Sequence, residues 1–310
     1  ENHARHSGVH AAGIIVTEDP VSNYCSVSSQ SGAAQIDKYD AESLNLLKID
    51  ALGLRTLSVL NDVLEQVGWE KEKIINFPLE DKEAFDVLNK EKHAGIFQFE
   101  GYALQSLTRQ MKISNFEDIA SITALARPGP LTSGGTTKYI RRKIGEEPVT
   151  YLHPLAEEIT KVTFGVVVYQ EQVMTIARDV GKLSWEDVSQ LRKAMSKSLG
   201  EEFFDRYWQK FKVGAEEQGI PEDESIKIWK NINTMGSWAF NRSHAIAYGL
   251  VSYWCCVLKS RYPLEFAAAC LRNVKDEDQG VKLLREVVKE GLVYKPYEKY
   301  KSELNWSVQD

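Results

Sequence analysis

From about residue 80 almost to the end of the chain, apolar residues recur every three or four positions, which is the period of helices packed on a core. Asp81 is placed to cap the first of these helices, and Ser184 with Asp187 three positions on resembles a capping box. A chain with this pattern over most of its length folds into a helical body. The predicted helices cover residues 81–90, 102–112, 115–126, 155–162, 169–180, 184–197, 201–218, 222–234, 243–260 and 263–272.

Two stretches interrupt this pattern. Arg127-Pro128-Gly129-Pro130 predicts a break, because two prolines and a glycine leave no helical path. Residues 132–137 consist of Thr, Ser and Gly and predict a flexible loop. The last part of the chain is charged and lacks a clear period, so no element is predicted there.

The first 68 residues differ from the rest. Short β-branched or apolar runs predict strands at 13–17, 33–37 and 46–50, and the last two of these runs end on an aspartate. Residues 54–67 then predict a helix, with Gly68 as its stop. The fold class is therefore mainly α with a small α/β portion.

Composition excludes several classes of protein. The chain has 310 residues, of which 43% are hydrophobic, too many for a disordered protein. Its net charge of −6 argues against a histone-like DNA binder. Four cysteines without a CxxC pair predict reduced thiols rather than a zinc site. We find neither a signal peptide nor an apolar run of about 18 residues, as a membrane span needs. The first residue, Glu1, suggests an excised or processed fragment.

Asp50 is the first candidate for chemistry, because it ends an apolar strand where a carboxylate is held rigidly near solvent. Two-metal phosphoryl transfer needs several such carboxylates around Mg²⁺. The alternative is that Asp50 caps the following helix. Asp37 could be a neighbour on an adjacent strand or only a strand-end cap. The sole D-x-D, at residues 276–278, lies in a hydrophilic stretch that reads as a solvated helix end.

Three further segments could bind phosphate, and each has a plainer alternative. Residues 127–143 carry five cations and no acid, which fits phosphate binding or a solvated loop. Residues 191–197 place basic groups on a helix, to hold a triphosphate or to complement the helix dipole. Residues 240–245 begin a helix, where an anion or a simple cap would fit. Arg242 there opposes the helix dipole, and a bound phosphate would relieve that conflict. The cations and polar groups concerned are Arg127, Lys138, Arg141, Arg142 and Lys143, then Arg192, Lys193 and Lys197, then Asn241, Ser243 and His244.

The order of these segments is more specific than any one of them. Residues 5–11, Arg-His-Ser-Gly-Val-His-Ala, resemble the RHxGVHA motif of the C-family replicases, the catalytic α subunits of bacterial DNA polymerase III. Gln35-Ile36-Asp37 and residues 48–57 are similar to its QxD and KxDxLGLxTL segments. The resemblance runs over roughly residues 3–275 and includes residues 95–100, 126–130, 165–174, 191–197 and 240–248.

The resemblance implies a fragment of a DNA-directed DNA polymerase: residues 1–68 as the end of a polymerase-β-like palm, 69–272 as helical fingers, and 273–310 as a linker or the start of another module. Asp50 would be the third catalytic carboxylate and a Mg²⁺ ligand, while the other two would precede the fragment. The isolated chain would then be inactive. The supporting palm residues would be Lys48, Gln35, Asp37, Arg5 and His10.

In the fingers, the resemblance places a deoxynucleotide's triphosphate on Arg192, Lys193 and Lys197, with Asn241, Ser243 and His244 lining the same pocket. The cations Arg127, Arg141, Arg142 and Lys143 would face phosphates of DNA or nucleotide. The implied partners are primer–template DNA, dNTP, the remainder of the polymerase chain and replisome proteins such as a sliding clamp, in the cytoplasm and away from membranes.

Three departures from the family pattern stand out: Ala51 replaces a usual aromatic residue, Lys193 a common Arg, and the tail from about 290 diverges. The rival hypothesis is a non-catalytic helical module that binds DNA or protein. A metal-dependent phosphohydrolase is disfavoured, because no histidine–aspartate cluster of the usual spacing occurs.

Overall fold

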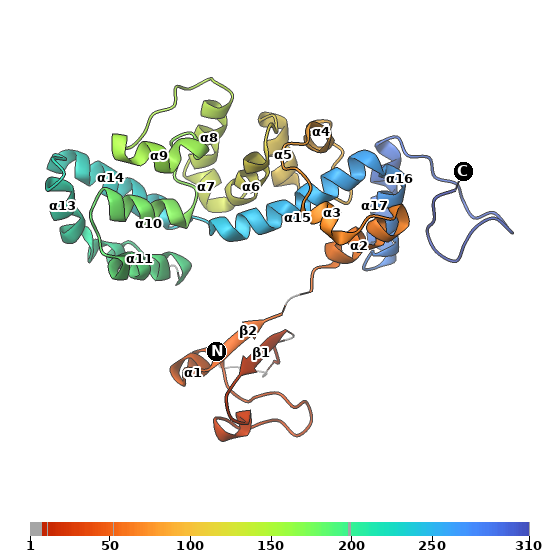
Figure 1. Cartoon of the computed structure of the whole chain (residues 1–310), viewed down its shortest axis with the longest axis horizontal. Coiled ribbons are helices and arrows are strands. Elements are labelled where there is room, and N and C mark those ends of the chain that lie inside the picture. The colour runs from red at the N-terminus through yellow and green to blue at the C-terminus, as the bar shows by residue number, and fades with distance from the viewer. Residues whose placement is uncertain (1–7, 11, 52, 198–199, 310) are drawn as a thin grey trace, which may run out of the picture. The chain divides into compact units, whose positions relative to one another are not determined.

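The computed structural model describes residues 8–10, 12–51, 53–197 and 200–309, and the side chains of Lys197 and Glu201 lie outside that description. The chain divides into two compact units, one up to Arg55 and one from Thr56 onward. Figure 1 gives the order of the elements.

The first unit holds a two-stranded antiparallel sheet, made by β1 (Gly13–Val16) and β2 (Leu47–Asp50). Its register pairs Gly13 with Asp50 and Val16 with Leu47. A short 3₁₀ turn, η1 (Val21–Asn23), and the helix α1 (Lys38–Ser43) lie between the strands. Two of the three predicted strands are therefore confirmed.

The predicted strand at 33–37 is wrong. Only an isolated bridge between Val27 and Ala34 forms there. Asp37 instead caps α1, because its Oδ1 accepts a hydrogen bond from the Asp40 N–H at 2.9 Å. An Asx residue that can cap a helix competes with strand pairing at the same place.

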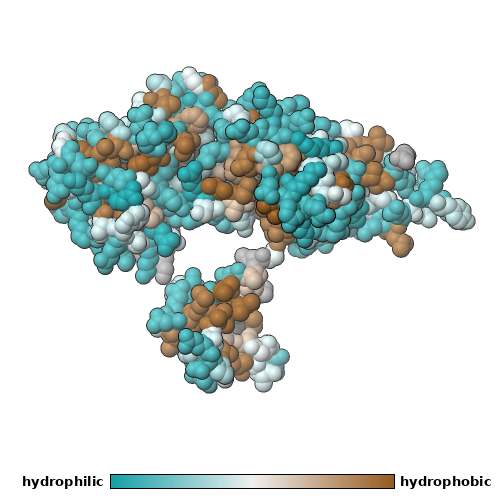
Figure 2. Space-filling model, in the orientation of Figure 1, coloured by the Kyte–Doolittle hydropathy of each residue, from teal (hydrophilic) through white to brown (hydrophobic). Residues whose placement is uncertain are grey.

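The alternation of side chains gives the small sheet two different faces. Ile14, Val16, Leu47 and Ile49 lie on one face, and all four are exposed. Gly13, Ile15, Lys48 and Asp50 lie on the other. Figure 2 shows apolar side chains gathered on the visible surface of this unit.

The second unit is entirely helical in its regular structure within the described residues. Helix formation there follows the predicted periodicity, so the mainly α fold class is confirmed. Its elements are α2 (Arg55–Val67), α3 (Lys71–Ile75), α4 (Lys82–Asn89), α5 (Tyr102–Gln110), α6 (Phe116–Leu125), α7 (Pro128–Thr132), α8 (Gly135–Lys143), η2 (Pro154–Ala156), α9 (Glu157–Thr160), η3 (Lys161–Thr163), α10 (Gln170–Asp179), α11 (Trp185–Lys197), α12 (Glu201–Asp205), α13 (Trp208–Glu216), α14 (Glu222–Gly236), α15 (Arg242–Arg261), α16 (Pro263–Arg272) and α17 (Glu277–Lys289).

Helix α15 is the axis of this unit and packs on α4 and α6 (Figure 1). Its second half is buried, including Tyr253, Cys255 and Cys256 at 0% exposure. The Tyr253 hydroxyl donates to the Pro78 carbonyl at 2.5 Å and accepts from the Asp81 N–H at 3.1 Å. Asp81 in turn caps α4, as predicted, so one buried tyrosine fixes the start of a neighbouring helix.

A second core joins α10, α11, α13 and α14 (Figure 1). The Phe211 ring lies 5.0 Å from the Trp229 ring and 6.3 Å from the Trp208 ring. Helix α13 approaches the residues that follow α10 so closely that a Cβ on Gly214 would lie 2.0 Å from the Gly181 carbonyl oxygen. Only glycine allows that approach.

The break predicted at the Arg-Pro-Gly-Pro segment is confirmed, because α6 ends at Leu125, but a new helix follows at once. Pro128 starts the short helix α7, because proline at the first helical position needs no N–H partner. Gly129 is required there, since a Cβ would lie 2.6 Å from the Trp238 Cβ. The loop predicted at 132–137 is also shorter than expected: α8 begins at Gly135, and the Thr136 hydroxyl donates to the Leu125 carbonyl at 3.0 Å.

Three other predictions needed correction. The helix predicted over 155–162 is divided into η2, α9 and η3. The helix predicted over 201–218 is divided into α12 and α13. Helix α17 was not predicted, although Asp276 caps it through the Gln279 N–H at 2.9 Å, which confirms the helix-end interpretation of the D-x-D. Among the described residues, no helix combines the length and the apolar character that crossing a bilayer requires.

Candidate functional site

Asp50 lies at the end of β2 in a small polar cluster. The Lys48 ammonium donates a short hydrogen bond to its Oδ1, and the His10 Nδ1 lies 3.8 Å from the same oxygen. Lys48 and Asp50 share a face because they are two residues apart on a strand. Gly13 pairs with Asp50 in the sheet, and a Cβ there would lie 2.9 Å from the His10 Nδ1. The glycine therefore lets His10 approach the strand.

The hydrogen bond from Lys48 lowers the pKa of Asp50 below its ordinary value of 3.8, and the charges of Lys48 and His10 act in the same direction. The carboxylate is thus ionised at neutral pH. Its side chain is 47% exposed, so it is open to a cation from solvent. Within the described residues it forms no cap on α2.

The other residues predicted to support this site have local roles. The Gln35 amide donates to the Ala33 carbonyl at 3.2 Å, and Asp37 caps α1. Arg5 lies outside the described residues. Across the part of the chain that is described, no three His, Cys, Asp or Glu side chains converge as a metal site.

Two of the cations predicted to bind phosphate are engaged inside the helical unit. The Arg142 guanidinium donates to the Thr150 and Phe164 carbonyls at 2.8 and 2.9 Å, and it pairs with Glu147. The Lys143 ammonium lies 2.7 Å from the Asp118 carboxylate, and both side chains are more than nine-tenths buried. These two charges hold segments of the fold together.

Arg127, Lys138 and Arg141 are different, because all three are exposed. Arg141 has one long contact, 3.8 Å to Glu146. The Arg127 guanidinium lies 5.0 Å from the centre of the Phe240 ring. Within the described residues, no carboxylate pairs with Arg127 or Lys138, so both are open to an anion.

Helix α11 presents the next predicted cations. Leu191, Ala194 and Met195 bury one side of the helix, which leaves Arg192 and Lys193 exposed. Neither of them has an ion-pair partner among the residues described. The Lys197 side chain lies outside that description.

Helices α10 and α15 begin side by side. The Gln170 N–H donates to the Phe240 carbonyl at 2.9 Å, and the Phe240 N–H donates to the Val168 carbonyl at 3.0 Å. This parallel bridge between Tyr169 and Phe240 holds the first residues of the two helices next to each other. Asn241 then caps α15 by accepting from the His244 N–H at 2.8 Å, as the sequence allowed.

Arg242 does not need a bound phosphate to offset its unfavourable interaction with the dipole of α15. Its backbone N–H donates to Glu171 at 2.9 Å, and its guanidinium lies 3.4 Å from Glu117. Glu117 also accepts from the Tyr169 hydroxyl at 3.3 Å. Two carboxylates therefore supply the negative charge that the sequence analysis sought in a ligand.

The sequence analysis missed a row of rings beside these groups, which we call the ring row: Phe240, His244, Tyr248 and Phe97. Their centroids follow one another at 5.5, 4.1 and 5.3 Å. Part of the signal was present, because His244 and Tyr248 are four residues apart on one helix and so share a face.

Packing brings α11 and the start of α15 into one region. The Met195 sulfur lies 3.5 Å from the position a Cβ would take on Gly236. Gly236 is the last residue of α14, five residues before Asn241. The C-terminal part of α11 thus packs against the end of α14, which leads into α15.

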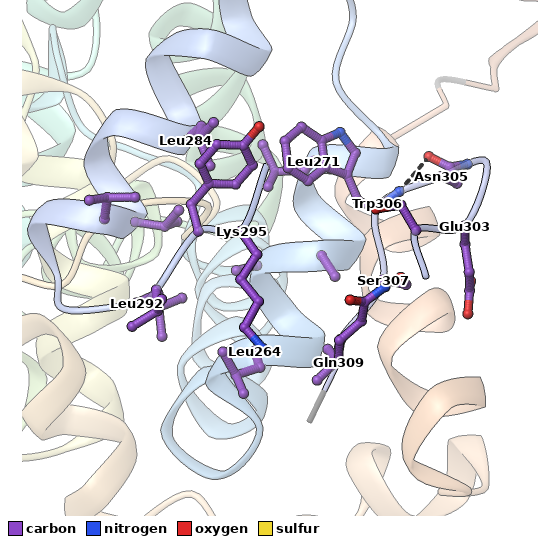
Figure 3. Close-up of a pocket in the computed structure, with 18 of the residues that line it drawn as sticks. Leu264, Leu271, Leu284, Leu292, Lys295, Glu303, Asn305, Trp306, Ser307 and Gln309 are labelled. Carbon is purple, nitrogen blue, oxygen red and sulfur yellow. Dashed lines mark hydrogen bonds between the residues drawn. The ribbon is translucent and has the colours of Figure 1, made fainter. Parts of the chain in front are cut away.

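A separate cavity of about 650 Å³ lies between α16, α17 and residues 291–309. Figure 3 shows Leu264, Leu271, Leu284, Leu292 and Trp306 among the side chains around it. None of the predicted site residues lines it, and its walls are mainly apolar.

Comparisons with known proteins show which family the sequence matches. Residues 56–219 match the family described as "Bacterial DNA polymerase III alpha subunit finger domain", and residues 1–53 match "Bacterial DNA polymerase III alpha NTPase domain". The first match covers more than half of the chain and ends inside the helical unit.

Several relatives named DNA polymerase III subunit alpha match the chain. That of Aquifex aeolicus is 36% identical over 315 residues, which cover 100% of this chain and 27% of the relative. That of Thermus aquaticus is 35% identical, covering 98% of this chain and 26% of the relative. That of Escherichia coli K12 is 34% identical, covering 91% of this chain and 26% of the relative.

The chain therefore belongs to the bacterial DNA polymerase III alpha subunit family. It spans about a quarter of the length of these curated relatives. The helical unit contains the part that matches the finger domain, and the small sheet lies in the part that precedes it.

Proposed function

We propose that the chain is the end of the palm and the fingers of a DNA-directed DNA polymerase, and that it binds an incoming dNTP and primer–template DNA. Arg192 and Lys193 carry the proposal, because both are exposed and have no ion-pair partner among the described residues. A triphosphate needs several donors that no carboxylate already occupies. Lys197 would extend the same group. Asn241, Ser243 and His244 would complete the nucleotide pocket from the start of α15.

DNA phosphates would meet Arg127 and Arg141, which are exposed, more readily than Arg142 and Lys143, whose charges already have internal partners. The domain limits that go with this proposal are residues 1–68 for palm and 69–272 for fingers, with 273–310 as a linker or further module. The compact units divide instead near residue 55.

Asp50 would be a Mg²⁺ ligand and the third carboxylate of the palm, with Lys48, Gln35, Asp37, Arg5 and His10 in support. A single exposed carboxylate does not fit a two-metal centre, which needs several converging oxygen ligands. The chain by itself would then be inactive, and the remainder of the polymerase chain is its first partner. The exposed apolar face of the small sheet supports such a partner.

Family membership further supports a cytoplasmic replisome setting, with a sliding clamp among the partners. The rival is a non-catalytic helical module that binds DNA or protein, which is favoured by the lack of a converging metal site in the described residues. The two functions differ in one property: only the polymerase fragment binds a dNTP.

A titration of the full chain with dNTP and Mg²⁺ decides between them. We expect saturable binding that the double substitution Arg192→Ala with Lys193→Ala weakens at least about tenfold, because charge-assisted hydrogen bonds to phosphate are lost. Lys227→Ala with Lys230→Ala, on the outer side of α14, is the matched control and should change nothing. Absence of binding by the unaltered chain would favour the rival.

Primer extension by the isolated chain provides the second measurement. We expect none, because the chain supplies one metal-binding carboxylate. Robust synthesis that depends on Asp50 would contradict the proposed division of the active site.

A further inference from the structure

The cavity between α16, α17 and the tail of the chain (residues 291–309) is bordered by apolar side chains that solvent reaches. Val293 is 81% exposed and Tyr297 is 76% exposed, and both line the cavity. Leu264 and Leu304 are exposed lining residues as well. Figure 3 shows that the helices and the tail both contribute to the wall. Exposed apolar surface that is contiguous in this way marks an interaction site.

Side-chain contacts hold the tail in place, although its described residues form no helix or strand. The Arg272 guanidinium donates to the Trp306 carbonyl, and it also binds the Asp62 carboxylate at 2.8 and 2.9 Å. The centre of the Trp306 ring lies 5.8 Å from that of the Tyr294 ring. These contacts fold one half of the tail onto the other half and onto α16.

Residues 304–308 have the pattern of a β-strand that lacks a partner strand. Leu304, Trp306 and Val308 alternate with Asn305 and Ser307, which is the period of a strand with one apolar face. The backbone N–H groups of Leu304, Asn305, Ser307 and Val308 have no hydrogen-bond partner among the described residues. An exposed run of open backbone groups is a template for pairing with another extended chain.

We propose that residues 304–308 and the adjoining cavity form a docking surface for an extended apolar segment of a partner protein. The segment pairs with the backbone of residues 304–308 as an added strand, and every second side chain of the segment enters the cavity. This inference goes beyond the proposed function, which treats residues 273–310 only as a linker or further module.

The lining of the cavity favours a polypeptide over a nucleic acid. Among the described residues that line it, only Lys295 and Glu303 are charged, and their charges are opposite. A nucleic acid needs several cations to neutralise its phosphates. A helical partner would satisfy its own backbone and would leave residues 304–308 unpaired.

A second copy of this chain fits the surface poorly. The Trp306 ring of each copy already packs against Tyr294 of its own tail, so it is not available to fill the cavity of another copy. The occupant is therefore a segment of a different protein.

Amide hydrogen exchange of the full chain, resolved by NMR, tests the docking surface. The probe is a synthetic peptide of about eight residues that alternates Val and Thr, since both favour extended structure. The peptide should slow exchange at least about tenfold at every second amide within residues 304–308. A strand directs alternate N–H groups toward one neighbour, so uniform slowing of all these amides would contradict strand pairing.

Two substitutions and one altered peptide separate the apolar contact from the backbone contact. Leu304→Ser should weaken peptide binding roughly three- to tenfold, because apolar area at the cavity is lost. Tyr300→Ser is the matched control, since Tyr300 is 92% exposed on the same tail and does not line the cavity. The same peptide with every backbone nitrogen methylated keeps its side chains but cannot donate, and it should not bind. Thermal melting of both variants checks that they fold.

Slowed exchange at alternate amides that Leu304→Ser reduces and Tyr300→Ser leaves intact supports the docking surface. No binding of the peptide at about 1 mM, equal binding of the methylated peptide, or an equal loss with Tyr300→Ser overturns it. Self-association of the chain that depends on Leu304, or oligo-dT binding that slows exchange at the same amides, would overturn the assignment of the occupant to a different protein.

Discussion

The two units of this protein hold their functional residues in opposite ways. In the first unit, Asp50 lies on a sheet of two four-residue strands whose other face is exposed. In the second, the cations and rings lie at the surface of a helical body with two extensive apolar cores. Two-stranded sheets are marginally stable by themselves. The candidate metal ligand thus depends on outside support, whereas the candidate nucleotide residues are held by their own unit.

The largest difference is expected from removing apolar volume in each unit. Phe211→Ala leaves a cavity in a core where the ring is 0% exposed and should cost about 3–5 kcal/mol of unfolding free energy. Ile49→Ala, at a side chain that is 45% exposed, should cost under about 0.5 kcal/mol. Urea unfolding followed by circular dichroism measures both. Equal costs would mean that the small sheet has a core of its own.

Breaking the buried ion pair comes next. Lys143→Met leaves the Asp118 carboxylate, 1% exposed, without its cation and should cost about 3 kcal/mol. Lys138→Met, on the same helix but exposed, should change stability by less than about 0.5 kcal/mol. The melting temperatures of the two variants give the comparison. A fall for Lys138→Met as large as that for Lys143→Met would show that position on the helix matters more than burial.

Acid should act on the helical unit through His93. Burial lowers the pKa of His93 from 6.5 to about 4, and the charge of Lys259 adds to this. The unfolded chain takes up the proton first, so stability is full above pH 6.5 and falls between pH 6.5 and 4. His93→Leu should flatten that loss, since the His93 ring nitrogens have no hydrogen-bond partner among the residues that the structure describes. Chemical unfolding at pH 7 and pH 5 measures how much unfolding free energy is lost on acidification. A loss in His93→Leu as large as in the unaltered chain would refute the role of His93.

The smallest effect concerns a single proton on the first unit. Lys48→Met should raise the pKa of Asp50 toward its ordinary 3.8, because the strongest cause of its depression is removed. Lys38→Met should raise it less. Any stability that Asp50 contributes is present above that pH and is lost on acidification. Carboxyl ¹³C titration by NMR resolves both shifts, and the opposite order would contradict the cluster described here.

Much of the fold could be predicted because it depends on local rules. The hairpin strands, the helix from Arg55 to Val67 and the caps at Asp81 and Asn241 all follow from short-range preferences that the structure confirms. Predictions based on short-range breakers were less secure. Pro128 starts α7 directly after α6 has ended, because proline at the first helical position needs no N–H partner.

The candidate site was less accessible to sequence reasoning. Residues 127–143 read as one basic segment, yet Arg142 and Lys143 point inward because Glu147 and Asp118 receive them. Arg242 suggested a bound anion, and its anions are Glu117 and Glu171 from two other helices. Charge counts along a sequence do not reveal which charges meet in the folded protein.

The bridge between Tyr169 and Phe240 joins two segments that lie far apart in the sequence. Helices α10 and α15 both begin next to this bridge. A residue inserted just before either helix would therefore shift where both helices begin relative to each other. Segments 164–169 and 237–240 are therefore poor places for insertions or affinity tags.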